Sequence, residues 1–280
     1  MKPKNDSLGD RMKTYEATSK TYLVRRTPVI IRIDGKAFHT FTKGFKKPFD
    51  DIFVKSMQET MKYLCENIQG CVFGYTQSDE ISLLLIDYTN LESCAWFDNQ
   101  VQKIVSVAAS MATMYFNKIF NESRADYVDS IMCFQDSDIE DTYLRALYRA
   151  SQNGALFDAR AFNLPKEEVT NYFIWRQNDA SRNSVNSVAQ AYFSHKELQG
   201  KSNSQMQDML MLQKQVNWND FPIHLKRGCS CFRIPEKEVI LVDLSGNEVA
   251  KEKIHAKWYI DLENPIFTQD RDYINCFVFK

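Results

Sequence analysis

Two short acidic motifs hold the residues of this sequence best suited to chemistry. Asp34 stands in an Arg-Ile-Asp-Gly run, and Asp79 in a Gln-Ser-Asp-Glu run. Paired carboxylates repel each other unless cations neutralise them. Mg²⁺ needs only one or two carboxylates together with substrate phosphates, and two such ions can assist both oxygens of a phosphoryl transfer. We predict Asp34 and Asp79 to be catalytic carboxylates that hold two Mg²⁺ ions, with the Gly35 carbonyl as a further ligand.

Other readings of the same motifs stay open. Asp-Gly at a strand end and Ser-Asp-Glu at a turn are each also typical of a solvated turn. Glu80 is the weaker metal ligand, because strand alternation points it away from Asp79. Ser78 is placed to bind phosphate or to orient a carboxylate.

The segment at 35–50, directly after the first motif, is rich in cations and aromatic rings. Its lysines can neutralise a triphosphate, and Phe38 or Phe45 can lie against a base. The spacing of a P-loop is absent, which argues against an ordinary ATPase. A solvated basic loop is the alternative, and His39 between aromatic residues is more typical of a structural role. The lysines are Lys36, Lys43, Lys46 and Lys47.

The elements around these motifs must bring Asp34 and Asp79 together. The patterns predict a helix over 7–20, a strand over 27–34, a helix over 49–67, strands over 71–76 and 80–87, a helix over 98–122 and a strand over 157–162. This order predicts an α+β chain with a ferredoxin-like (split βαβ) sheet. The first strand then lies beside the hairpin, and the two carboxylates converge at the strand ends.

The remainder predicts added helices and C-terminal strands. Residues 166–215 have mainly helical patterns, and strands are expected at 239–243 and 273–279. We divide the chain into a catalytic domain at 1–165 and an extension at 166–280 that packs on it and is not independent. Trp175 and Trp218 are expected in the core, with stacking on RNA bases as the alternative.

Composition sets wide limits. The chain has 280 residues and a net charge of −1, so RNA binding would depend on local basic patches. Lysines and arginines near the N-terminus, including Arg25 and Arg26, or near the middle, including Arg176, are candidates; a solvated face is the alternative. The seven cysteines lack a Cys-x-x-Cys pair, which favours buried reduced thiols over zinc. With no apparent signal or membrane segment, we expect a cytoplasmic protein.

At these residues the sequence resembles the tRNA(His) guanylyltransferase superfamily, which adds nucleotides to RNA in the 3′-to-5′ direction. The match runs through Arg-Ile-Asp-Gly-Lys-Ala-Phe-His at 32–39, Lys-Pro at 47–48 with Asp50, Tyr-Thr-Gln-Ser-Asp-Glu-Ile-Ser at 75–82, Phe-Asp-Ala-Arg at 157–160 and Trp-Arg-Gln-Asn-Asp-Ala at 175–180.

The resemblance implies a polymerase-type palm domain with the two metals on Asp34, Asp79 and the Gly35 carbonyl. A 5′-monophosphorylated tRNA is activated, typically by ATP; the 3′-hydroxyl of GTP or another NTP then attacks the activated end, and pyrophosphate is removed. Homotetramers are usual. The residues expected at the nucleotide are Lys36, Ala37, Phe38, His39, Phe45, Lys47, Asp50 and Ser78. Those expected at RNA are Arg25, Arg26, Arg160, Arg176 and Asn183.

One departure bears on the substrate. Enzymes specialised for tRNA(His) carry a His-Ile-Asn-Asn run where this chain has Ser-Arg-Asn-Ser at 181–184. The resemblance then favours the guanylyltransferase-like branch, which repairs 5′-truncated tRNA by copying the opposite strand. Alternatives are a tRNA(His)-specific enzyme that adds a single G, a palm-type nucleotidyl cyclase, and a non-catalytic RNA-binding relative.

Overall fold

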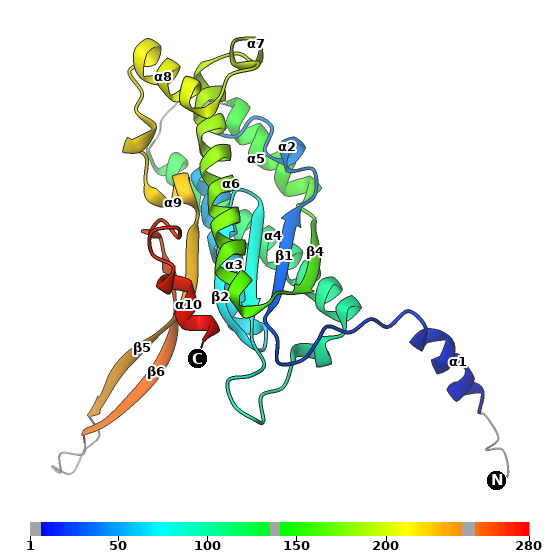
Figure 1. The fold of residues 1–280 in the computed structure, drawn as a ribbon. Helices are drawn as coiled ribbons and strands as arrows, with labels where there is room; N and C mark the ends of the chain where they lie inside the picture. The colour runs from blue at the N-terminus through cyan, green and yellow to red at the C-terminus, as the bar shows by residue number, and fades with distance from the viewer. Residues whose placement is uncertain (1–6, 135–140, 242–249, 280) are drawn as a thin grey trace, which may run out of the picture.

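A computed structural model describes residues 7–134, 141–241 and 250–279. Six strands form one antiparallel sheet in the order β4-β1-β3-β2-β5-β6 (Figure 1). The strands are β1 (Val29–Gly35), β2 (Cys71–Gln77), β3 (Glu80–Leu85), β4 (Phe157–Asn163), β5 (Cys229–Leu241) and β6 (Ala250–Asp261). The predicted mixture of helices with an antiparallel sheet is confirmed.

Helices cover both faces of this sheet. The helices in the part of the chain that the structure describes are α1 (Leu8–Ala17), α2 (Phe38–Phe41), α3 (Asp51–Asn67), α4 (Val101–Phe134), α5 (Asp141–Asn153), α6 (Lys166–Tyr192), α7 (His195–Leu198), α8 (Asn203–Lys214), α9 (Ile223–Arg227) and α10 (Asp272–Val278), with short 3-10 turns at Trp96–Asn99 and Trp218–Asp220. No described helix is long and apolar enough to cross a membrane.

The two faces of β1 explain why its sequence is almost continuously apolar. Ile31 and Ile33 point into a core shared with α3 and α4. Ile30 points into a second core, where α6 and α10 cover the opposite face. A strand buried on both faces needs apolar side chains at consecutive positions, so β1 is held firmly up to its last residues, where Asp34 lies.

The second half of the chain extends the same sheet. β5 pairs with β2, and β6 pairs with β5 along its whole length. In Figure 1 the β5–β6 ribbon and α1 both reach out from the body of the molecule, and α1 has no buried residue. A boundary near residue 165 stays a prediction.

The C-terminal strand predicted at 273–279 is wrong, because this segment forms helix α10. Ile274 and Val278, four residues apart, are both fully buried against the second core. A short apolar run fits either period, and packing against α6 selects the helix. The strand predicted at 239–243 is the end of the longer β5 as far as Leu241; residues 242–249 lie outside the described residues.

Candidate active site

Asp34 and Asp79 lie beside each other at one end of the sheet. Asp34 and Glu80 form the last residue pair of the β1–β3 ladder. The next bond of this ladder runs from the Gly35 amide to the Asp79 carbonyl, at 3.0 Å. Burial raises the pKa of Asp79, and the nearby charge of Asp34 raises it further. The convergence expected from the strand order is therefore present.

Gly35 is required by the packing beside it. A Cβ at this position would lie 2.3 Å from the Phe38 ring, which is 5% exposed and surrounded by other aromatic rings. Phe38 therefore belongs to the core, and the expectation that its ring lies against a base is wrong. Its role is to fix the backbone that follows Asp34.

A cavity of about 240 Å³ opens next to the β2–β3 turn. Four of the residues expected at the nucleotide line it, together with Asn183 from α6. Helix α3 forms another wall, and α9 closes a further side with His224. The four are Phe45, Lys47, Asp50 and Ser78.

Two of these cavity residues also have structural contacts. Asp50 is the N-cap of α3, accepting a hydrogen bond from the Phe53 amide at 3.0 Å and another from the Tyr143 hydroxyl at 2.7 Å. The Phe45 ring stacks on Phe120 with centroids 5.8 Å apart. Burial and the Asp50 carboxylate raise the pKa of Tyr143. Asp50 is thus fixed in place as part of the cavity wall.

The short segment after Asp34 lies outside this cavity. Lys36, Ala37 and His39 are exposed, and Ala37 has a left-handed backbone with φ of 55° just before α2. The Lys36 amide donates to the Leu156 carbonyl at 2.8 Å. This segment is close to the carboxylates because it follows Asp34 in the sequence, whereas Lys47 and Ser78 line the cavity.

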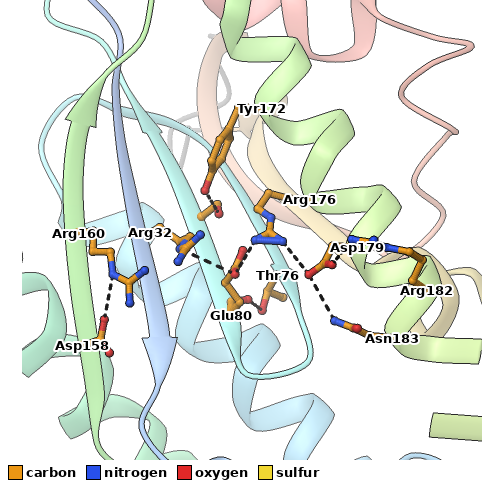
Figure 2. Close-up of polar contacts among 11 residues, drawn as sticks. Arg32, Thr76, Glu80, Asp158, Arg160, Tyr172, Arg176, Asp179, Arg182 and Asn183 are labelled. Atoms are coloured by element: carbon orange, nitrogen blue, oxygen red, sulfur yellow. Dashed lines mark hydrogen bonds and ion pairs between the residues drawn. The ribbon is translucent and has the colours of Figure 1, made fainter. Parts of the chain in front are cut away.

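The Glu80 carboxylate forms ion pairs with two arginines, Arg32 and Arg176 (Figure 2). It accepts a hydrogen bond from Arg176 at 3.1 Å and lies 3.9 Å from Arg32. Burial raises the pKa of Glu80 to about 7, although both arginines oppose the shift. These contacts agree with the expectation that Glu80 is the weaker candidate for a metal ligand.

The residues expected at RNA fall into two groups. Arg25, Arg26, Arg160 and Asn183 are exposed; Arg25 lies 3.9 Å from both Asp87 and Asp98, and Arg160 lies 3.7 Å from Asp158.

Arg176 is the exception among these residues. It is 4% exposed and paired with Glu80, so the expectation that it contacts RNA is wrong. Trp175, expected in the core, is 49% exposed and stacks on the Arg176 guanidinium. Trp218 is partly buried and donates to the Ser184 hydroxyl at 3.0 Å.

The donor set at the carboxylates suits Mg²⁺. Among the residues whose side chains the structure describes, no group of three or more His, Cys, Asp or Glu is placed to hold a metal. Asp34 and Asp79 supply two carboxylates, and the Gly35 carbonyl supplies a backbone oxygen. Mg²⁺ is usually bound through one or two carboxylates, with substrate phosphates and water completing its coordination shell. A dication would also relieve the repulsion that raises the pKa of Asp79.

Two features of the site were missed in the sequence. The Arg176–Glu80 pair joins residues far apart in the chain, and no local sequence pattern predicts it. The cavity wall from α6 and α9 likewise depends on tertiary packing. The Trp-Arg-Gln motif at 175–177 was the available signal, but it did not distinguish a buried arginine from an exposed one.

Comparison with known proteins gives the relatives of this chain. A family model described as Thg1, tRNAHis guanylyltransferase, matches residues 9–165. A bacterial tRNA(His) guanylyltransferase (Thg1)-like protein solved with ATP is 42% identical, with a TM-score of 0.75, over 98% of this chain and 100% of that one. A structure of such a protein with GTP is 40% identical, with a TM-score of 0.73 and the same coverage.

Curated relatives are more distant. The tRNA(His) guanylyltransferase 2 of Arabidopsis thaliana is 25% identical over 96% of this chain, which spans 47% of that protein's length. Protein R259 of Acanthamoeba polyphaga mimivirus is 28% identical over 88% of this chain and 82% of its own length. The family match covers more than half of the sequence and includes both carboxylate motifs, and the chain therefore belongs to the tRNAHis guanylyltransferase (Thg1) family of nucleotidyltransferase enzymes.

Proposed function

We propose that this chain is a template-dependent 3′-to-5′ nucleotidyltransferase that adds nucleotides to the 5′ end of tRNA and so repairs truncated 5′ ends. The observation that carries the proposal is the meeting of Asp34 and Asp79 at the strand ends, beside a cavity lined by Lys47 and Ser78. Family membership supplies the direction of synthesis.

The catalytic unit is proposed to be a ferredoxin-like, polymerase-type palm. The order β1-α3-β2-β3-α4-β4 and the strand arrangement β4-β1-β3-β2 support this. Asp34, Asp79 and the Gly35 carbonyl would hold two Mg²⁺ ions. When bound, such ions stabilise charge on the attacking and leaving oxygens of phosphoryl transfer.

The protein's own residues orient the nucleotide. Lys47 places a cation at the cavity and Ser78 a hydroxyl, both of which suit phosphate oxygens. The Phe45 ring offers an apolar surface for a base, and the segment at 36–39 is proposed to contact the triphosphate. GTP and ATP are proposed as substrates, since similar bacterial proteins were solved with each.

Repair of truncated tRNA is favoured by the residue at 181. Where enzymes specialised for tRNA(His) carry a histidine, Ser181 donates a hydrogen bond to the Gln177 carbonyl of its own helix at 3.1 Å. A short side chain held on its helix offers no imidazole to a tRNA(His) anticodon. Exposed Arg25, Arg26, Arg160 and Asn183 are proposed to contact tRNA, and the protein is proposed to be a cytoplasmic homotetramer.

Replacement of Asp79 tests the chemistry of the proposal. Asp79→Ala is expected to abolish nucleotide addition to a 5′-monophosphorylated tRNA while tRNA binding stays nearly unchanged. Glu122→Ala, which removes an exposed carboxylate on α4, is the matched control and should keep full addition. Full turnover by Asp79→Ala would refute the assignment of the carboxylates.

A second measurement separates this reaction from the alternatives. The wild-type protein is incubated with labelled ATP or GTP and Mg²⁺ in the absence of RNA. A cyclic nucleotide product would identify a cyclase. In a parallel incubation that contains several truncated tRNAs, absence of any nucleotide addition would identify a non-catalytic RNA-binding relative.

A further inference from the structure

A buried ionic bridge connects α6 to the hairpin that carries Asp79. The Arg176 guanidinium donates from Nη1 to Glu80 at 3.1 Å and from Nη2 to Asp179 at 2.7 Å (Figure 2). The side chains of Arg176 and Glu80 are 5% and 9% exposed. One planar cation therefore links a helix and a strand whose residues lie about a hundred positions apart in the chain.

The strand end of this bridge is next to the proposed metal ligands. Glu80 follows Asp79 directly in the chain and pairs across the ladder with Asp34. Its backbone carbonyl accepts a hydrogen bond from the Thr76 hydroxyl at 2.8 Å, which closes the base of the hairpin. Movement of Glu80 would therefore move Asp79 relative to Asp34.

The helix end of the bridge reaches the cavity. Asp179 accepts a second hydrogen bond from Arg182 at 2.5 Å and a longer one from Asn183 at 3.4 Å. Asn183 and Ser78 both line the cavity. The chain of contacts from Glu80, the sequence neighbour of Asp79, to the cavity wall thus passes through Arg176 (Figure 2).

An arginine is suited to this position. Its planar fork donates to two carboxylates at once, and the centre of the Trp175 ring lies 3.9 Å from the guanidinium carbon. A buried ion pair adds little stability compared with apolar side chains of similar volume. Its presence here points to a need for fixed geometry beside the carboxylates.

We propose that Arg176 is a positioning residue, which holds Asp79 and the α6 wall of the cavity in register through Glu80 and Asp179. This inference rests on the proposed function, because it assumes that Asp34 and Asp79 bind a divalent metal. It assigns Arg176 no contact with substrate or RNA.

Binding of Mn²⁺ alone tests the inference without requiring catalysis. Affinity is measured by electron paramagnetic resonance on the full chain, as wild type, Arg176→Met and Arg176→Lys. Loss of a residue that orients metal ligands typically weakens metal binding about 10–100-fold. We expect at least a 10-fold loss in Arg176→Met and a smaller loss in Arg176→Lys, because lysine keeps the positive charge but lacks the planar fork that holds two carboxylates in fixed directions.

A matched control separates positioning from general stability. Tyr172 also joins α6 to β3, through a hydrogen bond of 2.7 Å to Ser82, which lies two residues beyond Glu80 on β3. Tyr172→Phe should keep its Mn²⁺ affinity within about 2-fold of wild type. An equal loss in Tyr172→Phe and Arg176→Met would assign Arg176 a merely structural role.

The remaining outcomes are distinct. If Asp34→Asn/Asp79→Asn binds Mn²⁺ as wild type does, the proposed metal site fails, and this inference fails with it. If that variant loses binding while both Arg176 variants bind within 2-fold of wild type, only the inference fails. Should Arg176→Met not fold, Arg176→Lys decides alone, with turnover at saturating Mg²⁺ expected to fall while the KM for tRNA is unchanged.

Discussion

Replacing Gly35 by alanine is expected to destabilise the protein through a clash with Phe38. The added Cβ would lie 2.3, 2.5 and 2.8 Å from three atoms of the Phe38 ring. The ring cannot swing away, because it is 5% exposed and packs among neighbouring rings whose centroids lie 5.1 to 5.8 Å from its own. These neighbours are Phe41, Phe53, Phe116 and Phe157.

The size of this effect follows from how little the site can relax. Overpacking a core costs about 1–3 kcal/mol, and three close atoms on an enclosed ring place Gly35→Ala at about 3 kcal/mol. With an unfolding entropy of about 2.1 cal/mol/K per residue, a chain of 280 residues should lose about 5 °C in Tm.

Thermal unfolding in metal-free buffer, followed by circular dichroism, measures the effect. Phe38→Leu in the same background should recover at least about 1 kcal/mol, because the two positions are in contact. Gly9→Ala is the control: its Cβ would meet nothing closer than Ser7 at 3.9 Å, so stability should change by less than about 0.5 kcal/mol. Additive effects of Gly35→Ala and Phe38→Leu would refute the steric reasoning.

Three further predictions concern neighbouring residues. Ser78→Gly should stabilise the fold by about 1 kcal/mol in urea unfolding, since Ser78 holds φ at 49°; a destabilised variant would contradict this. Tyr143→Phe should cost about 1.5 kcal/mol in the same assay through loss of the bond to the Asp50 carboxylate, and an unchanged midpoint would contradict it. Burial raises the pKa of Glu80 to about 7, so the folded protein keeps a proton that the unfolded chain releases near pH 4.5. Stability of the metal-free protein should therefore fall as pH rises from about 4.5 to 7 and then level off, with Glu80→Gln showing a flatter profile.

The carboxylate pair could be predicted from the sequence because its placement depends on regular elements. The apolar run of β1 ends at Asp34, and the two-residue turn between β2 and β3 presents Asp79. Once strand order is inferred from the alternation of helices and strands, the two ends must meet. Periodicity and turn chemistry are local signals and act before tertiary packing.

Burial of single side chains could not be predicted in the same way. Phe38 and Arg176 have residue types typical of a binding loop and a basic surface, yet both are enclosed by elements distant in the sequence. Trp175 is the reverse case, an aromatic residue left half exposed because the Arg176 guanidinium covers only one of its faces. At Phe38 and Arg176 long-range contacts decide the outcome.

The C-terminal segment illustrates the same limit at the level of an element. Seven consecutive residues at 273–279 are compatible with either period, and contact with α6 makes α10 a helix. The pairing of β5 with β2 is also non-local, since β2 lies far earlier in the chain.

Nucleotide addition to a 5′-monophosphorylated tRNA that lacks its first nucleotide, measured beside full-length tRNA(His), tests the proposed repair function most directly. Each substrate is incubated with the four NTPs and Mg²⁺, and the added nucleotide is identified by sequencing the 5′ end. We predict preferential extension of the truncated tRNA, with the nucleotide complementary to the opposite strand. Addition of a single G to tRNA(His), with no extension of the truncated substrate, would contradict it.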